Sequence, residues 1–419
     1  MNNCLVLITN SYPYSSEEPF LEPELPYLAE RFKKIIILAI GLGKGAEKTR
    51  VAPDNADCYN VISCTKKVNR AVCLATGAIR TFLPPDKEAD SEVRGNLKKR
   101  VFYEYFRARG EREYAQCEKI LDKYDFSQFD SVTVYSYWFF TAALVGTKIY
   151  EYIKPSCENI KLVSRAHGYD VYRYANSLNY LPMRKYLLDR YDKVHPCSID
   201  GERHILSQFP GYEDKVVHSY LGTEDCGVSE MNENCFHIVS CSRMIGLKRV
   251  DRIASALSLL KNKSPVALRW THIGDGKTME KVRAIAEEKL GFMQVNLMGR
   301  ISNAQVLDFY KNEKIDLLIN VSTTEGLPVS MMEVLSYSVP VLATDVGGVS
   351  EIIKDGYNGV LIPSDFTDEE LADEIQKMIL SDKAERQQMR NNARQSWKDN
   401  FNSKENLSKF AEDLTTRNN

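Results

Sequence analysis

Two glutamates eight positions apart carry the most specific chemical signal in this sequence of 419 residues. A strand is expected to end near Val321, and a loop containing Glu325 follows it. Pro328 suits the first turn of a helix that runs to about Ser338 and contains Glu333. Free backbone N–H groups at such a helix start bind anions, so the segment predicts a diphosphate site. Its backbone contacts are expected from Gly326, Leu327, Pro328 and Val329.

Glu333 is flanked by apolar residues on both sides within this predicted helix. A carboxylate in such surroundings is unfavourable unless it accepts hydrogen bonds, and sugar or ribose hydroxyls are natural donors. The alternative is a helix glutamate that reaches solvent. Glu325, by contrast, lies just before the anion site.

Two cations follow another predicted strand and precede the helical pattern Val250–Leu260. Arg243 and Lys248 are expected at the sheet edge, where a phosphate gains charge-assisted hydrogen bonds and the field of the helix dipole. The alternative is a pair of exposed surface cations. Glycine turns after two further strands, at Gly274 and at Gly299 with Arg300, would let a ligand approach the backbone.

The first half of the chain offers polar and aromatic candidates in the same setting. His167 and Asp170 follow a predicted strand, and a structural histidine is the alternative for His167. Side chains suited to sugar contacts occur in the long first loop, at Tyr12 and Glu18, and at the end of another predicted strand, at Tyr137 and Trp138. For Tyr137 and Trp138 the alternative is aromatic packing in the core.

Short apolar runs that alternate with amphipathic stretches must position these residues, and they predict βα units around parallel sheets. Ligands of such sheets bind at the carboxyl ends of the strands. A helix is expected over Glu22–Phe32, and the expected strands are Cys4–Thr9, Lys34–Ala39, Val132–Ser136, Lys161–Arg165, Phe236–Cys241, Ala267–Ile273, Gln294–Met298, Leu317–Val321 and Val341–Thr344. We expect two Rossmann-like α/β domains facing across a cleft, residues 1–224 and 236–396, joined by a linker at 225–235.

Composition excludes several classes of protein. The chain is 43% hydrophobic and 27% charged, which argues against disorder, collagen and coiled coils. Its 55 Lys and Arg against 57 Asp and Glu lack the basic excess of a duplex nucleic-acid binder. Ten scattered cysteines without a Cys-x2-Cys pair suit free thiols in a reduced cytosol.

The sequence also bears on location. The N-terminus has no basic signal-peptide region, and the longest uncharged stretch, 131–147, is too short to span a bilayer. A cytoplasmic protein is therefore expected. Residues from roughly 62 to 125 are helical in pattern, with basic patches between 66 and 109. These patches favour either a solvated helical face or attraction to an anionic membrane surface or a lipid-phosphate acceptor. These patches contain Lys66, Lys67, Arg70, Arg80, Lys98, Lys99, Arg100, Arg107 and Arg109.

The segment from Glu325 to Glu333 resembles the E-x7-E motif of the retaining glycosyltransferases of family 4, which have the GT-B architecture. The flanking residues 320–324 and 340–351 match as well, as do Ser242-Arg243 with Lys248, 274–276 and 298–300. The resemblance covers about residues 236–365. The N-terminal half resembles the family at His167–Asp170 and, weakly, at Tyr12-Pro13 with Glu18–Phe20. The last pattern looks like bacterial exopolysaccharide and lipopolysaccharide glycosyltransferases.

The resemblance implies a UDP- or GDP-linked sugar donor on the second domain and a glycan or lipid-linked acceptor on the first, as in a hexosyltransferase of capsule, exopolysaccharide or lipopolysaccharide synthesis. Arg243 and Lys248 would neutralise the diphosphate, Glu325 would contact the donor sugar, and Glu333 would hold the ribose. Arg300 and its turn would border the base, and His167 would touch the donor sugar. Residues 397–419 would form a helix that crosses back to the first domain.

Configuration is retained in this family by front-face attack, with the phosphate as base. The sequence has no Asp-x-Asp motif, so neither a metal nor another cofactor is required, and cationic side chains can take that electrostatic role. Ser15-Ser16-Glu17-Glu18 stands where many members have a Gly-Gly turn, which argues against phosphate contact from the first loop. The enzyme is expected to lie peripherally on the inner face of the plasma membrane.

Two other functions fit the sequence less well. A non-catalytic GT-B subunit supporting a partner enzyme would be expected to lose a key cation or glutamate, and all four are present. A nucleotide-dependent oxidoreductase needs G-x-G-x-x-G in its opening βαβ unit, and the first loop has no glycine.

Overall fold

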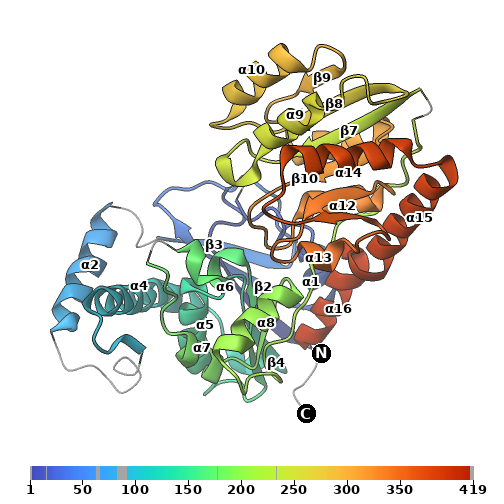
Figure 1. Ribbon diagram of the computed structural model, residues 1–419. Helices are drawn as coiled ribbons and strands as arrows, with labels where there is room; N and C mark the ends of the chain where they lie inside the picture. Colours follow the sequence, from blue (N-terminus) through green and yellow to red (C-terminus); the bar gives the residue numbers. More distant parts are fainter. Residues whose placement is uncertain are drawn as a thin grey trace. The chain divides into compact units, whose positions relative to one another are not determined.

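The computed structural model describes residues 2–15, 17–62, 67–82, 92–176, 178–232 and 234–415, with only the backbone for 67–69. The chain forms two compact units (Figure 1). Unit 1 comprises Met1–Ser219 and Leu407–Asn419, and unit 2 comprises Tyr220–Asn406. The first division falls between Ser219 and Tyr220, so residues 225–235, predicted as a linker, lie in unit 2.

Unit 1 is built on a parallel six-stranded sheet in the order β3-β2-β1-β4-β5-β6. Every residue of β1 is buried, because a central strand of a parallel sheet is covered on both faces. The strands are β1 (Asn3–Thr9), β2 (Lys34–Leu42), β3 (Ala56–Ile62), β4 (Ser131–Ser136), β5 (Ile160–Ala166) and β6 (Lys193–Pro196).

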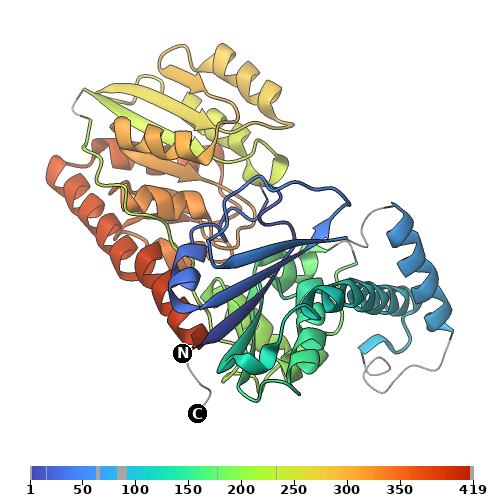
Figure 2. The same cartoon turned by 180° about the vertical axis from the view of Figure 1, so that it is seen from behind.

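Two hydrophobic cores cover the faces of this sheet. One contains residues of the long helix α4 and of α5 and α7. The other contains residues of α1 and of the C-terminal helix α16 (Ser403–Thr415). Figure 2 shows the chain from behind. The helical segments of unit 1 are α1 (Leu25–Arg31), α2 (Lys67–Thr81), α4 (Leu97–Leu121), η1 (Phe126–Gln128), α5 (Thr141–Ile153), α6 (Gly168–Val171), η2 (Arg173–Ala175), α7 (Arg184–Arg190) and α8 (Ile199–Gln208).

Unit 2 repeats the same plan with a parallel sheet in the order β12-β11-β10-β7-β8-β9. Its strands are β7 (Cys235–Cys241), β8 (Ala267–Ile273), β9 (Gln294–Leu297), β10 (Leu317–Asn320), β11 (Val341–Thr344) and β12 (Gly359–Ile362). Its helical segments are η3 (Gly246–Lys248), α9 (Val250–Ser258), α10 (Met279–Lys289), α11 (Asn303–Asn312), α12 (Val329–Ser336), α13 (Val349–Ile352), α14 (Asp368–Leu380) and α15 (Lys383–Asn400), and α16 (Ser403–Thr415) continues into unit 1.

Two cores hold unit 2 together, one on each side of its sheet. The first includes Trp270 and residues of α9, α10 and α14. The second includes residues of α12, α13 and α15, and Trp397 is fully buried in it. Capping boxes start three of the helices, at Ser302 for α11, Thr367 for α14 and Asp382 for α15.

The predicted pair of parallel α/β sheets is confirmed, and every predicted strand is present to within a few residues at its ends. Two helix starts differ from the prediction. Helix α1 begins at Leu25 rather than Glu22, with Pro26 in its first turn. Pro328 is the N-cap residue, so α12 begins one residue later, at Val329. Within the described residues, no helix is long and apolar enough to cross a membrane.

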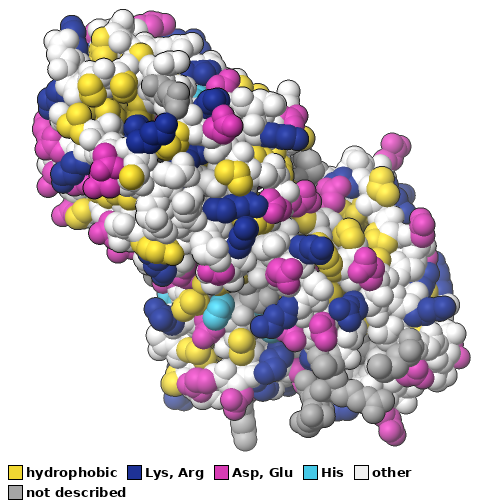
Figure 3. All heavy atoms as spheres, turned by 90° about the vertical axis from the view of Figure 1, so that its right-hand side faces the viewer, with side chains coloured by type: hydrophobic (Ala, Val, Ile, Leu, Met, Phe, Trp, Pro, Cys, Tyr) yellow, Lys and Arg dark blue, Asp and Glu magenta, His cyan; other side chains and the backbone are white. Residues whose placement is uncertain are grey.

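The basic region predicted over residues 66–109 is partly neutralised where it is described. Arg80 and Arg107 both pair with Glu111, and Arg109 pairs with Glu113. Figure 3 shows Lys and Arg side chains interspersed with Asp and Glu over the face in view. Lys66 and the side chain of Lys67 lie outside the described residues, and contact with a membrane stays a prediction.

Candidate functional site

Both sheets have a topological switch point, a place where the strand order reverses. In unit 2 it lies between β7 and β10, and in unit 1 between β1 and β4. Loops that leave the carboxyl ends of two such strands diverge to opposite faces of the sheet and open a crevice that binds ligands. The switch point therefore indicates where a substrate site belongs in each unit.

At the switch point of unit 2, Lys248 from the loop after β7 meets Glu325 from the loop after β10. The ammonium Nζ lies 2.5 Å from Oε1 of Glu325. The same oxygen accepts hydrogen bonds from Asn320 Nδ2 at 3.1 Å and Ser322 Oγ at 2.6 Å. The structure thus brings together two residues that the sequence placed in one site, and it directs three donors to one carboxylate oxygen.

Arg249 holds the two loops in this arrangement. It takes the left-handed conformation with φ 49°, and its guanidinium donates to the carbonyls of Val321 at 2.6 Å, Ser322 at 3.1 Å and Ser364 at 2.7 Å. The backbone N–H of Thr323 also donates to the carbonyl of Leu247 at 2.8 Å. Sequence reasoning missed Arg249 because its partners are distant backbone carbonyls, which no local pattern identifies.

Two glycines allow the neighbouring loops to approach at the same sheet edge. Gly274 has φ +139°, and a Cβ there would lie 1.9 Å from the carbonyl oxygen of Ser242. Gly347 has φ +55°, and a Cβ there would lie 1.9 Å from the carbonyl oxygen of Glu325. A side chain at either position would push a candidate donor loop aside.

The other predicted donor residues lie on the same loops. The N–H of Gly274 donates to the carbonyl of Gly299 at 2.9 Å, and that of Gly348 donates to Gly326 at 3.0 Å. Val329 begins α12, whose first N–H groups have no acceptor within the helix. The side chains exposed on these loops include the predicted cations Arg243 and Arg300.

Glu333 is buried in α12, with 6% of its surface exposed. Asn303, the first residue of α11, donates from Nδ2 to Glu333 Oε1 at 2.9 Å. Burial raises the pKa of Glu333 to about 7, and the bond from Asn303 opposes that rise. The predicted alternative of a solvent-reaching glutamate therefore does not hold for the structure.

At the switch point of unit 1, Glu18 from the loop after β1 meets Trp138 from the loop after β4. Trp138 Nε1 donates to Glu18 Oε1 at 2.6 Å. The same carboxylate accepts from the backbone N–H groups of Asn10, Ser11 and Tyr12 at 2.7–2.8 Å. A run of N–H groups that could hold an anion is thus filled by the chain's own glutamate.

His167 and Asp170 cap the short helix α6 after β5. His167 Nε2 lies 3.0 Å from the carbonyl of Tyr137, and Nδ1 lies 3.3 Å from Cys197 Sγ. Burial, with a contribution from Arg165, lowers the pKa of His167 to about 3, so the ring is neutral. Because the carbonyl needs a proton from Nε2, Nδ1 accepts from the thiol.

Asp170 accepts from the backbone N–H of Phe139 at 2.6 Å and of His167 at 2.5 Å. Its carboxylate thus ties the ends of β4 and β5. The centres of the Trp138 and His167 rings lie 4.6 Å apart. Tyr137 also packs against the His167 ring and is buried, in agreement with the core-packing alternative for Tyr137. Tyr12 is also buried, and its hydroxyl donates to the carbonyl of Val51 at 2.5 Å.

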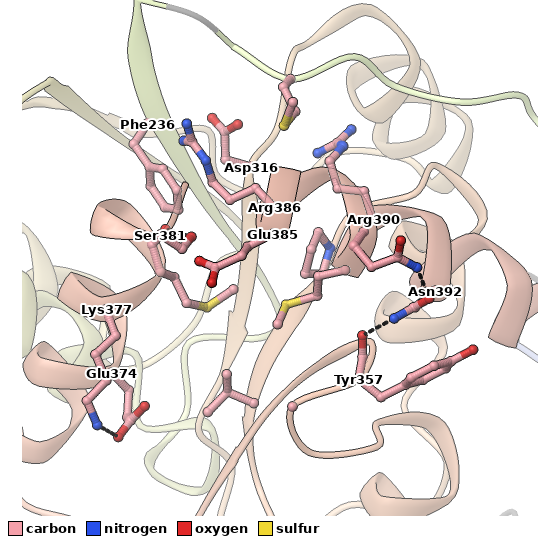
Figure 4. Close-up of a pocket in the computed structure, with 17 residues that line it drawn as sticks. Phe236, Asp316, Tyr357, Glu374, Lys377, Ser381, Glu385, Arg386, Arg390 and Asn392 are labelled. Atoms are coloured by element: carbon pink, nitrogen blue, oxygen red, sulfur yellow. Dashed lines mark hydrogen bonds and ion pairs between the residues drawn. The ribbon is translucent and has the colours of Figure 1, made fainter. Parts of the chain in front are cut away.

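A separate cavity of about 500 Å³ lies at the opposite edge of the unit 2 sheet (Figure 4). Phe236, Asp316 and Pro340, which line it, lie at or next to the amino ends of β7, β10 and β11. Ligands of parallel sheets bind at the carboxyl ends, so this cavity is distinct from the candidate donor site. Within the described ranges, no three His, Cys, Asp or Glu side chains gather as a metal site would require.

Comparison with known proteins adds independent information. Residues 224–396 match the family described as "Glycosyl transferases group 1". An uncharacterised glycosyltransferase of Methanocaldococcus jannaschii is 26% identical over 230 residues, which are 54% of this chain and 60% of that protein. A poly(ribitol-phosphate) alpha-N-acetylglucosaminyltransferase of Staphylococcus aureus is 26% identical over 204 residues, 47% of this chain and 39% of that protein. These matches span less than two thirds of either relative.

Solved structures resemble the chain over almost its whole length. The apo form of the lipopolysaccharide outer core galactosyltransferase WaaB has a TM-score of 0.67 at 14% identity, covering 99% of this chain and 100% of that one. HepE of Anabaena, solved in complex with UDP, has a TM-score of 0.62 at 14% identity, with 99% of both chains covered. The fold is therefore GT-B, as predicted.

Proposed function

We propose that this chain, whose residues 224–396 match the glycosyl transferases group 1 family, is a retaining glycosyltransferase. It moves a sugar from a UDP- or GDP-linked donor to a glycan or lipid-linked glycan in bacterial capsule, exopolysaccharide or lipopolysaccharide synthesis. The observation that carries the proposal is the contact between Lys248 and Glu325 at the switch point of unit 2, beside the start of α12.

Unit 2 supplies the groups that a nucleotide-sugar donor needs. The Lys248 ammonium has three N–H donors, of which Glu325 uses one, so the others are available to a diphosphate oxygen. The N-terminal N–H groups of α12 and the exposed Arg243 add positive potential. All described hydrogen bonds to Glu325 fall on Oε1, which leaves Oε2 to accept from a donor-sugar hydroxyl.

Glu333 is suited to the donor ribose. It is buried and receives a bond from Asn303, in the segment that follows β9. Ribose hydroxyls would donate to the carboxylate and compensate its desolvation. Arg300 and the Gly299 turn precede the same helix α11, and we assign the base to that side.

The reaction follows from these roles. The acceptor hydroxyl attacks the anomeric carbon on the face from which the diphosphate departs. The bond from that carbon to the diphosphate oxygen breaks with its electron pair, and a phosphate oxygen takes the proton of the hydroxyl. Lys248 and the α12 N–H groups stabilise the negative charge that develops on the leaving diphosphate. Configuration at the anomeric carbon is retained.

Unit 1 would present the acceptor. Glu18 fixes the indole of Trp138 next to His167 at the switch point, which supports an aromatic surface for a sugar ring. His167, neutral and held through both ring nitrogens, is assigned to shape this surface and contact the donor sugar. The relatives' names point to similar acceptors, since they include poly(ribitol-phosphate), colanic acid and O-antigen. A cytoplasmic, membrane-peripheral location stays a prediction.

A donor screen tests the proposal. The purified chain is incubated with UDP- and GDP-linked sugars, and thermal unfolding is followed, since a ligand that binds only the folded state raises its stability by about 2.7 kcal/mol at one hundred times Kd. Nucleotide release and the anomeric configuration of the product are then measured. Binding without turnover would favour a non-catalytic subunit, and binding of no nucleotide would contradict the donor site.

A further inference from the structure

Unit 1 contains a second cavity that the proposed reaction does not use. It has a volume of about 520 Å³, within the usual range for small-molecule sites, and lies between the first turn of α4 and the helix α7. Four of its lining residues are cationic: Lys99, Arg173, Arg184 and Lys185. Two are acidic, Glu92 and Asp189, and three are aromatic, Tyr180, Tyr186 and Phe209.

The acidic residues are already engaged. Glu92 Oε1 accepts from the Tyr180 hydroxyl at 2.5 Å and from the backbone N–H of Met183 at 2.8 Å, and burial raises its pKa. Asp189 pairs with Lys185 at 2.8 Å, so those two charges cancel. When ionised, Glu92 also attracts Arg184 and Arg173, so the four cationic and two acidic residues leave the lining with an excess of two positive charges.

Two cations stay open toward a ligand. Among the described residues, neither Lys99 nor Arg173 forms an ion pair, and the Lys99 ammonium lies 5.3 Å from the centre of the Tyr180 ring. Arg184 is buried, and its Nη1 and Nη2 donate to the backbone carbonyls of Phe139 and Asp170. The described lining thus combines an excess of positive charge with aromatic surface.

This chemistry fits a phosphorylated sugar. A guanidinium binds phosphate oxygens with a planar pair of donors, an ammonium adds a point charge, and aromatic rings cover the apolar faces of sugars. A neutral glycan would accept hydrogen bonds from Lys99 and Arg173 but would gain less from their charge than a phosphate does. Arg184 also links the cavity wall to the ends of β4 and β5, where the acceptor side of the proposed function lies.

We propose that this cavity binds a phosphate group carried by the acceptor, so that the substrate class of the enzyme is a phosphorylated glycan or glycan-lipid. That the ligand is the acceptor rests on the proposed function, whereas binding of a phosphate group in the cavity does not. The phosphate belongs either to a sugar phosphate in the glycan or to a lipid carrier, and the two sources offer the same anionic group.

Calorimetric titration of the full chain with glucose 1-phosphate, farnesyl phosphate and neutral methyl glucoside tests the proposal. Wild type should bind at least one of the phosphates and prefer it to methyl glucoside. The double variant Lys99→Gln with Arg173→Gln should weaken phosphate binding by about tenfold or more, because two charged donors are lost. The control Lys98→Gln removes an exposed neighbouring cation that does not line the cavity and should leave binding unchanged.

Stronger binding of glucose 1-phosphate identifies a glycan phosphate, and stronger binding of farnesyl phosphate identifies a lipid carrier. The proposal is overturned if wild type binds neither phosphate, if methyl glucoside binds equally well, or if the double variant keeps full affinity while its unfolding midpoint matches wild type. An unfolded double variant is replaced by Lys99→Gln alone, for which the same criteria apply. Absence of nucleotide-sugar turnover would contradict the proposed function and leave this binding result standing.

Discussion

Lys248 Nζ and Glu325 Oε1 lie 2.5 Å apart, although 77 positions separate the residues in sequence. They lie on the loops that follow β7 and β10, the neighbouring strands between which the strand order reverses in unit 2. Both side chains are mostly covered, at 21% and 9% exposure, so their attraction is less screened than that of a surface pair. In the proposed function, the negatively charged leaving group and the donor sugar meet at this pair.

Arg249 is a positioning residue for this pair, which predicts a combined loss of stability and turnover. Arg249→Met removes three hydrogen bonds to carbonyls and should cost about 2–4 kcal/mol of unfolding free energy, while lowering kcat/KM further in protein that remains folded. Chemical denaturation and steady-state kinetics measure the two effects.

Arg252→Met is the matched control. Arg249 and Arg252 both lie over the Phe366 ring, but Arg252 pairs with the side chain of Asp368 instead of with the carbonyls of the Glu325 loop. It should lose stability but keep kcat/KM. Equal kinetic losses in the two variants would contradict the positioning role of Arg249.

Glu333 predicts a pH dependence with a definite sign. Its pKa rises from 4.5 to about 7 on folding, so the unfolded chain releases the proton more readily, and stability falls as pH rises from about 4.5 to 7. Glu333→Gln should abolish that part of the dependence and make the ligand-free protein more stable at pH 8, by up to about 3 kcal/mol.

Nucleotide affinity should change in the opposite direction, because ribose hydroxyls donate to the ionised carboxylate. Wild type should bind nucleoside diphosphate more weakly as pH falls below about 7, and Glu333→Gln should bind weakly at every pH. Titrations between pH 5.5 and 8 measure this. Equal affinity of wild type and variant across the range would remove Glu333 from the donor site.

Gly347 predicts a steric effect on the Glu325 loop. Gly347→Ala adds a Cβ 1.9 Å from the carbonyl oxygen of Glu325, whereas Gly356→Ala, at a similar φ of +69°, meets nothing within 4 Å. Both carry a strain of about 1–3 kcal/mol, so the difference in unfolding free energy isolates the clash. Gly347→Ala should also lose donor binding; identical behaviour of the two variants would contradict the loop contact.

Replacing Glu18 should change the KM of the acceptor more than the KM of the donor. Glu18→Gln replaces a carboxylate that accepts from three backbone N–H groups and from Trp138, so the indole should lose its fixed orientation. The acceptor KM should rise by about tenfold or more, with a smaller change in kcat and in the KM of the donor. A change confined to thermal stability would make the role of Glu18 structural only.

The sequence predicts the central strands well and the sheet margins poorly. The strands that it missed, β3, β6 and β12, are all edge strands. β3 (Ala56–Ile62) is mostly half-buried and carries polar residues, while β6 (Lys193–Pro196) and β12 (Gly359–Ile362) have only four residues each. An edge strand is covered less than a central one, and short strands are common there, so the apolar signal is weak.

The convergence of the proposed donor residues at one sheet edge was predictable, because they are concentrated in short loops that follow strong strands. The acceptor side was less so, since the importance of Glu18 comes from Trp138, 120 positions away. Arg249 and Asp170 act through backbone groups of other loops. Such long-range hydrogen bonds leave no periodic trace in a single sequence.

The central claim is that Lys248 and Glu325 form a nucleotide-sugar site, and turnover of the Lys248→Ala variant tests it most directly. With the donor selected by the screen, Lys248→Ala should lower kcat by about 10²–10³ in protein that remains folded. It should lower the unfolding free energy by about 1–3 kcal/mol, because Glu325 keeps only its bonds from Asn320 and Ser322. Lys281→Ala, which breaks an exposed pair with Asp251, should keep wild-type kcat. Unchanged turnover in folded Lys248→Ala, or an equal effect of Lys281→Ala, would contradict the account.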